Sequence, residues 1–161
     1  MKLYLVRHGE AKSELEDSQR RLTEPGRRDV ERVAAWLAPL RLPVAAVWHS
    51  GKARARETAA IIAGAVVCGA PPSERAGLAP DDAADGVRAD IEHAAGDVMI
   101  VGHLPFLARL AALLLAGWTE GVVVDFQVGG VVCLEQGGAG TPRGPRWGVR
   151  WSVSPELLPA P

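Results

Sequence analysis

A histidine and an arginine stand side by side near the start of the chain, in the run Arg7-His8-Gly9-Glu10. The apolar residues Leu3 to Val6 precede them and predict a buried strand, which would deliver both side chains to its carboxyl end. Ligands of open α/β sheets bind at that end of the strands. A neutral imidazole placed there can attack an electrophile, and a guanidinium beside it can hold an anion in a planar fork. The run therefore indicates phosphoryl transfer through a histidine.

Two further apolar runs also end in polar side chains. Residues 44–48 predict a strand that leads to Ser50, and Arg54 follows one helical turn later. Residues 98–101 predict a strand that leads to His103. If these strands are parallel neighbours, their polar ends converge on one rim. Imidazoles and guanidiniums gathered there repel one another unless an anion lies between them, and a phosphoryl group fits because arginine binds its oxygens in pairs.

The elements that must position these groups alternate between strand and helix, as βαβ units require. Thr23 is suited to cap a helix that Pro39 would end, and the apolar positions between them recur with helical spacing. Ser50 is suited to cap the next helix, and the helix N-termini at Ser50 and Leu104 would add backbone donors to the rim. The pattern predicts further helices at residues 52–63, 83–95 and 105–117, and further β structure at residues 66–68, 122–126, 131–135 and 149–153.

Taken together, these elements predict an α/β fold: a three-layer α/β/α sandwich with a mostly parallel central sheet, helices on both faces and an antiparallel edge from the later strands. Residues 71–82 are expected to form a loop, and residues 137–148, rich in glycine and proline, a surface hairpin loop. The length of 161 residues predicts a single domain, residues 1–161.

The composition is that of an ordinary globular protein, 48% apolar and 23% charged, with a net charge of −1. No basic field indicates nucleic acid, and no apolar stretch predicts a membrane span or a signal peptide, so the cytoplasm is the simplest location. Cys68 and Cys133 lack a CxxC spacing and are expected to be reduced thiols. No metal or organic cofactor is expected, because the arginines around the histidines would repel a cation and the glycines form no nucleotide-binding motif.

Several motifs of the chain resemble those of a known family. The motifs Arg7-His8-Gly9, Ser50-x-x-x-Arg54-Ala55 and Gly102-His103 are similar to those of the histidine phosphatase superfamily, which includes the phosphoglycerate mutases. The resemblance is closer to the small SixA-type branch, the phosphohistidine phosphatases. It is carried there by Arg20-x-Leu22-Thr23-x-x-Gly26, His103-Leu104-Pro105 and the late run Trp151 to Pro155. Two positions depart from the branch, because Arg21 and Gly51 stand where proline is common.

The resemblance implies a phosphoglycerate mutase-like fold and a role for each motif residue. His8 would be the nucleophile that accepts the phosphoryl group on a ring nitrogen, and water would then hydrolyse phospho-His8. Arg7, Arg54 and His103 would bind the phosphoryl oxygens and stabilise the transition state. Arg20 would lie at the pocket mouth. Ser50 is a further candidate for phosphate binding.

The acid that phosphate esters require has no clear counterpart in the sequence. Mutases and acid phosphatases of the superfamily protonate an alkoxide leaving group with a carboxylic acid, whereas residues 78–85 offer Asp81, Asp82 and Asp85 without a clear motif. A phosphoramidate leaves as an imidazole and asks less of an acid. Asp81 or Asp82 as general acid remains the alternative to a solvated loop carboxylate.

We therefore expect a phosphohistidine phosphatase that acts on a protein, such as a histidine phosphotransfer or phosphocarrier domain, through phospho-His8. One alternative is a phosphatase or mutase for a small phosphomonoester. The other is a weakly catalytic module that binds a phosphoprotein.

Overall fold

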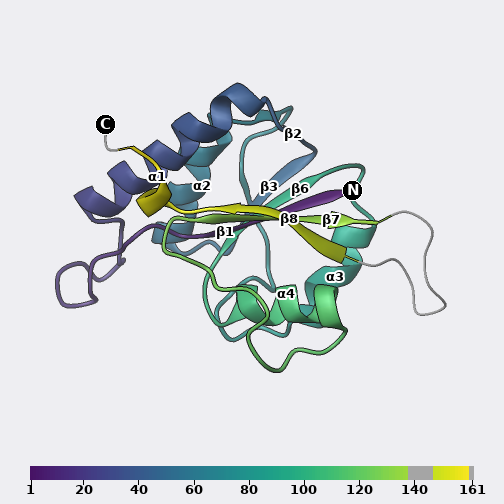
Figure 1. Ribbon diagram of the computed structural model, residues 1–161. Helices are drawn as coiled ribbons and strands as arrows, with labels where there is room; N and C mark the ends of the chain where they lie inside the picture. Colours follow the sequence, from purple (N-terminus) through teal and green to yellow (C-terminus); the bar gives the residue numbers. More distant parts are fainter. Residues whose placement is uncertain (138–146, 160–161) are drawn as a thin grey trace.

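A six-stranded sheet forms the centre of the protein, for which a computed structural model describes residues 1–137 and 147–159 (Figure 1). Its strands are β1 (Lys2–Arg7), β3 (Ala46–His49), β5 (Ser73–Glu74), β6 (Val98–Gly102), β7 (Val131–Gln136) and β8 (Trp147–Val153). They follow the order β5-β3-β6-β1-β7-β8 across the sheet. The first four in this order are parallel, whereas β7 pairs antiparallel with both β1 and β8. The predicted parallel sheet with an antiparallel edge is confirmed.

Helices cover both faces of the sheet. α1 (Glu24–Leu37) and α2 (Ala53–Ala63) lie on one face, and α3 (Ala84–Glu92) and α4 (Phe106–Ala116) lie on the other (Figure 1). Two short 3-10 helices, η1 (Ala38–Leu40) and η2 (Pro155–Leu157), follow α1 and β8. The three-layer α/β/α sandwich expected from the sequence is therefore confirmed.

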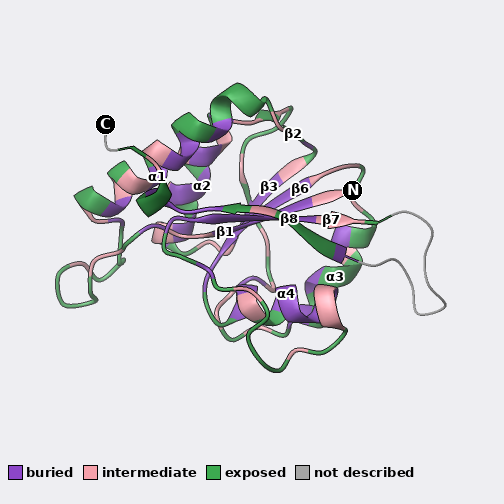
Figure 2. Ribbon diagram, viewed as in Figure 1, coloured by how far each residue is buried: buried purple, intermediate pink, exposed green. Residues whose placement is uncertain are grey.

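The alternation of side chains along β1 explains why two separate cores form. Leu3 and Leu5 pack in the cluster that holds α3 and α4, whereas Tyr4 and Val6 pack in the cluster that holds α1 and α2. A strand buried on both faces needs apolar residues at every position, and Figure 2 shows the central strands as buried. The continuous apolar run before Arg7 is thus the signature of a central strand.

The register of the parallel strands brings three strand ends to one edge. β6 lies between β1 and β3, with Gly102 beside Arg7 and Val101 beside His49. The residues that follow β1, β3 and β6 therefore leave the sheet at the same edge, where α/β proteins bind their ligands.

Local signals fix the ends of two helices as the sequence indicated. The Thr23 hydroxyl caps α1 by accepting a hydrogen bond from the Gly26 amide at 2.9 Å. A Cβ at Gly26 would overlap the Glu10 carbonyl oxygen, so this glycine lets α1 press against the loop that follows β1. Gly117 ends α4 in the left-handed conformation, with φ of 83°.

The structure corrects several predicted elements. The strand predicted at 44–48 is divided, because β2 (Pro43–Val44) pairs with β4 (Val67–Cys68) in a separate two-stranded sheet and β3 begins only at Ala46. Residues 71–82 are not all loop, since β5 adds to the edge of the main sheet. Residues 122–126 form no strand, and Val122 and Val123 are exposed. The hairpin loop predicted at 137–148 lies mostly outside the described residues. No described helix is long and apolar enough to cross a membrane.

Candidate active site

The carboxyl edge of the sheet brings the two motif histidines together. His8 follows β1 and His103 follows β6, and their ring centroids lie 4.9 Å apart. The backbone amide of His8 donates to the Gly102 carbonyl at 3.1 Å, so the parallel pairing of β1 and β6 continues into the site. Arg54, in the first turn of α2, reaches the same place from the opposite side of β6.

The hydrogen bonds of His8 leave one ring nitrogen free to act as a nucleophile. Its Nδ1 lies 2.7 Å from the Gly9 carbonyl oxygen and must carry a proton to donate to it. Its Nε2 is then unprotonated and accepts a hydrogen bond from Nε of Arg54 at 3.2 Å. The pKa of His8 is lowered to about 4, first by burial and also by the charges of Arg54, Arg7 and Arg20, while the bond to Gly9 opposes the shift. His8 is therefore neutral at neutral pH, with a lone pair on Nε2.

A buried hydroxyl holds the turn that carries His8. The Oγ1 of Thr58 accepts from the Gly9 amide at 3.1 Å and donates to the Arg54 carbonyl at 2.8 Å. Thr58 is fully buried in α2. It thus joins the residue after the nucleophile to the backbone of Arg54. The sequence predicts no role for Thr58, because no local signal reveals this contact.

His103 is almost fully buried and faces Ser50. Its Nε2 lies 2.5 Å from the Ser50 hydroxyl, whereas Nδ1 is buried and has no hydrogen-bond partner among the described residues. An unpaired buried N–H costs more than an unpaired nitrogen lone pair, so the proton belongs on Nε2 and is donated to Ser50. The pKa of His103 is lowered to about 3, first by burial and then by the charges of protonated His8, Arg54, Lys52 and Arg20.

Ser50 does not cap α2, contrary to the sequence prediction. The N-cap of α2 is Lys52, and no side chain bonds the helix amides there. The Ser50 oxygen accepts from His103 instead, and its own proton stays available for an anion in the hollow formed by Arg7, His8, Arg54 and His103. Tertiary contact with β6 has replaced the local cap.

Arg7 is anchored by a loop that sequence reasoning did not connect to the site. A terminal guanidinium nitrogen of Arg7 donates to the Phe126 carbonyl at 2.7 Å, and the Gly129 amide donates to the His8 carbonyl at 3.2 Å. Phe126 is itself buried in the core. The segment between α4 and β7 therefore orients Arg7, although 119 residues separate the two partners.

Arg20 lies at the rim, close enough for its charge to lower the pKa of both His8 and His103. Its Nε donates to the Lys12 carbonyl at 3.3 Å, and its backbone is left-handed with φ of 51°. The neighbouring Arg21 is held by Asp17 at 2.7 Å and does not take its place. Arg20, Lys52 and Arg54 line a cavity of about 340 Å³ together with Glu14, Ser18, Gln19 and Ala53.

Gly51 explains why proline is absent after Ser50. Its φ is +78°, which the proline ring forbids, and its amide donates to Nδ1 of His49 at 3.1 Å. Its Cα also lies against the Glu74 carboxylate, which a Cβ would approach within about 2.5 Å. His49 is thus buried beside the site as a support for the turn, and burial lowers its pKa while Glu74 opposes the shift.

Asp81 and Asp82, the carboxylates considered as general acids, have different surroundings in the structure. An Oδ of Asp82 accepts from the Ala79 amide at 2.7 Å, which commits it to a local turn, and Asp81 is exposed. The charges that shift the pKa values of His8 and His103 are those of cations. The described residues also contain no group of three side chains able to hold a metal ion.

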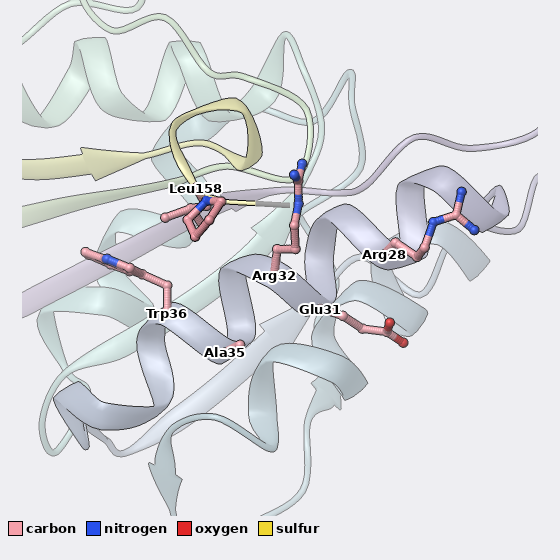
Figure 3. Close-up of a pocket in the computed structure, with 7 residues that line it drawn as sticks. Arg28, Glu31, Arg32, Ala35, Trp36 and Leu158 are labelled. Atoms are coloured by element: carbon pink, nitrogen blue, oxygen red, sulfur yellow. The ribbon is translucent and has the colours of Figure 1, made fainter. Parts of the chain in front are cut away.

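A second cavity, of about 540 Å³, lies apart from this edge of the sheet. It opens between α1 and the C-terminal segment and is lined by Arg28, Glu31, Arg32, Ala35, Trp36, Leu158 and Pro159 (Figure 3). Its size does not make it the catalytic centre, because it contains none of the groups that surround His8.

Comparison with known proteins agrees with this arrangement. The sequence model of the histidine phosphatase superfamily (branch 1) matches residues 3–79, which include the motifs of His8 and Arg54. An uncharacterized protein from Picosynechococcus sp. is 35% identical over 146 residues, which cover 86% of this chain and 87% of that protein. The chain belongs to the histidine phosphatase superfamily. It is accordingly a phosphatase.

Solved structures of other proteins share the fold of this phosphatase over nearly its whole length. The protein histidine phosphatase SixA in complex with tungstate matches with a TM-score of 0.80 at 23% identity, over 98% of this chain and 99% of that one. A mycobacterial glucosyl-3-phosphoglycerate phosphatase matches with a TM-score of 0.69 at 17% identity, over 95% and 99%. The phosphoglycerate mutase-like fold expected from the sequence is thereby confirmed.

Proposed function

We propose that this phosphatase hydrolyses phosphohistidine on a protein through a phospho-His8 intermediate, as a member of the SixA-type branch. The observation that carries the proposal is the state of His8. Its Nε2 is unprotonated, its Nδ1 is held by the Gly9 carbonyl, and Arg54 bonds the reacting nitrogen. A neutral imidazole surrounded by cations is prepared to attack a phosphorus atom whose oxygens those cations neutralise.

In the first step, Nε2 of His8 forms a bond to phosphorus while the bond from phosphorus to the substrate nitrogen breaks. The electron pair of the broken bond stays on the departing imidazole, which leaves as a neutral ring when its other nitrogen carries a proton. Arg7, Arg54 and His103 bind the three phosphoryl oxygens, and the Nε2 proton of His103 exchanges the Ser50 oxygen for a phosphoryl oxygen when the substrate binds. Removal of one such donor is expected to lower kcat by a factor of about 10²–10³, as for an oxyanion hole.

In the second step, water attacks phospho-His8 from the side that the leaving imidazole has vacated. The oxygen–phosphorus bond forms, the bond from phosphorus to Nε2 breaks, and phosphate departs with the proton lost to solvent. His8 returns to its neutral form, which its lowered pKa favours. The same residues serve both displacements.

The charges around the rings support a phosphoramidate as substrate. An alkoxide leaving group needs an acid, yet Asp82 is bound to a backbone amide, Asp81 is exposed, and the charges that shift the pKa values of the two histidines are those of cations. Tungstate in the similar SixA structure supports an oxyanion in this hollow. We infer that a phosphorylated protein surface presents its histidine to Arg7, His8, Arg54 and His103, with Arg20 at the mouth and Ser50 as an additional donor.

A parallel assay tests this function: release of phosphate from a phosphohistidine-bearing protein and from ordinary phosphomonoesters. We expect the phosphohistidine substrate to be preferred and His8→Ala to abolish its turnover. His93→Ala is the matched control, because His93 is exposed at the end of α3. If His8→Ala hydrolyses at the parent rate, the mechanism is wrong, and stable binding without turnover by the parent would instead identify a binding module.

A small phosphomonoester is the second candidate, and one observation favours it. The cavity of about 340 Å³ beside Arg54 has room for a small leaving group. Such a substrate requires an acid, for which Asp81 and Asp82 are the sequence candidates. A strong preference for the phosphomonoester in the same assay would establish this function in place of the first.

A further inference from the structure

Four cations gather around the two histidines without a carboxylate partner. Arg7, Arg20, Lys52 and Arg54 take part in none of the ion pairs among the described residues. His8 and His103 add no charge at neutral pH. A phosphoryl dianion therefore balances only two of these four charges.

The surplus charge lies on one side of the hollow. Arg20 and Lys52 line the cavity of about 340 Å³, and Arg54 lines it too while its Nε bonds His8. Arg54 therefore lies between the reacting nitrogen of His8 and the cavity. The carboxylate of Glu14 also lines the cavity and offsets one positive charge. With a phosphoryl dianion bound, one positive charge remains for the substrate to balance.

Lys52 occupies a position that a helix does not favour. It is the N-cap of α2, where Ser, Thr, Asp or Asn is preferred, and its side chain makes no capping bond. A cation there also faces the positive end of the helix dipole. Residues that break local rules without a structural gain are concentrated at functional sites. The charge of Lys52 contributes to the lowered pKa of His103, so the Lys52 side chain lies near the reacting groups.

We propose that this cavity binds a second acidic group of the substrate, a carboxylate beside the phosphoryl group, and that Lys52 and Arg20 select for it. The inference rests on the proposed function, since it assumes that phosphoryl groups bind beside His8. The carboxylate belongs either to an acidic side chain next to a phosphohistidine or to a small phosphomonoester. In both cases Lys52 determines which substrate is preferred and does not contact the reacting atoms.

Binding of two matched phosphonates tests the cavity without any catalysis. Phosphonoacetate carries a phosphonate and a carboxylate, and ethylphosphonate replaces the carboxylate by a methyl group. By titration calorimetry of the full chain, we expect about tenfold tighter binding of phosphonoacetate. Lys52→Gln should reduce this preference to about twofold, because one of the two selecting cations is lost.

The control Arg109→Gln removes one exposed positive charge from α4 and should keep the full preference. Equal binding of both phosphonates by the parent, binding of neither, or an undiminished preference in Lys52→Gln would overturn the proposal. Loss of turnover in every assay with the phosphonate preference intact would overturn the proposed function and leave the cavity assignment standing.

Turnover then identifies which substrate carries the carboxylate. One arm compares kcat/KM for phosphohistidine peptides that have Asp or Asn next to the modified residue, and the other compares phosphoglycolate with ethyl phosphate. We expect one pair to show a preference of about tenfold for the acidic member that Lys52→Gln reduces. The pair that responds names the source, and a preference independent of Lys52 in both pairs would contradict the role of this residue.

Discussion

The hydroxyl of Thr58 is expected to hold the nucleophile in place, and Thr58→Val removes it while preserving the shape of the side chain. The substitution leaves the Gly9 amide without its acceptor at 3.1 Å in a fully buried position. A buried donor without a partner costs about 1–3 kcal/mol. The Arg54 carbonyl lies inside a helix and loses only a second bond, which adds little. We therefore expect the free energy of unfolding to fall by about 2 kcal/mol, or the Tm by about 4–8 °C for a domain of this size.

The same substitution should slow the reaction, because the Gly9 carbonyl orients the His8 ring at 2.7 Å. A small displacement of a positioned nucleophile costs about tenfold or more in rate, so kcat/KM should fall by about that factor. Urea unfolding followed by tryptophan fluorescence measures the stability, and phosphate release from one fixed substrate measures the rate.

The matched control is Thr58→Ser, which keeps the hydroxyl and loses a buried methyl group. It should cost about 1 kcal/mol of stability and retain nearly the full rate. If Thr58→Val is as active as Thr58→Ser, the hydroxyl does not position His8 and this reasoning is refuted.

Two further perturbations follow from the same geometry. The imidazole of His8 should titrate in NMR spectra with a midpoint near pH 4, and stability should fall as pH drops from about 6.5 towards 4, because only the unfolded chain binds the proton readily in that range; a midpoint near 6.5 would show that His8 is not buried among cations. Gly51→Ala should cost about 1–2 kcal/mol for its left-handed φ, and Gly51→Pro should cost more because it also removes the amide donor to His49. Urea unfolding of the two variants measures the costs, and a proline variant as stable as the parent would contradict the assigned turn.

The central strands and the motif histidines could be predicted because local patterns determine them. A short, fully apolar run before Arg7 or Gly102 is typical of a strand buried on both faces, and neighbouring parallel strands bring their ends together. The cap at Thr23 is equally local, since its acceptor and donor lie three residues apart.

The contacts that complete the site could not be predicted, because they join distant segments. The bond from Arg7 to the Phe126 carbonyl and the bond from Gly9 to Thr58 depend on how the layers pack. Ser50 was expected to cap α2 but contacts His103 across the sheet edge, a tertiary partner that no sequence window contains.

The valines of residues 122–126 misled the prediction for a related reason. Their β propensity is real, but a strand also needs a free sheet edge, and β7 already occupies the edge beside β1. The segment instead follows α4 as irregular backbone, with Val122 and Val123 exposed and Phe126 buried. Propensity alone could not distinguish these outcomes.

The decisive measurement concerns the covalent intermediate on His8. The protein should be mixed rapidly with a phosphohistidine substrate, quenched in base, where phosphohistidine survives, and mapped by mass spectrometry. One phosphoryl group on the peptide that contains His8, absent in His8→Ala and lost on acid treatment, is the predicted result. Turnover that proceeds with no phosphoryl group on His8, or with the label on another residue, would contradict the account.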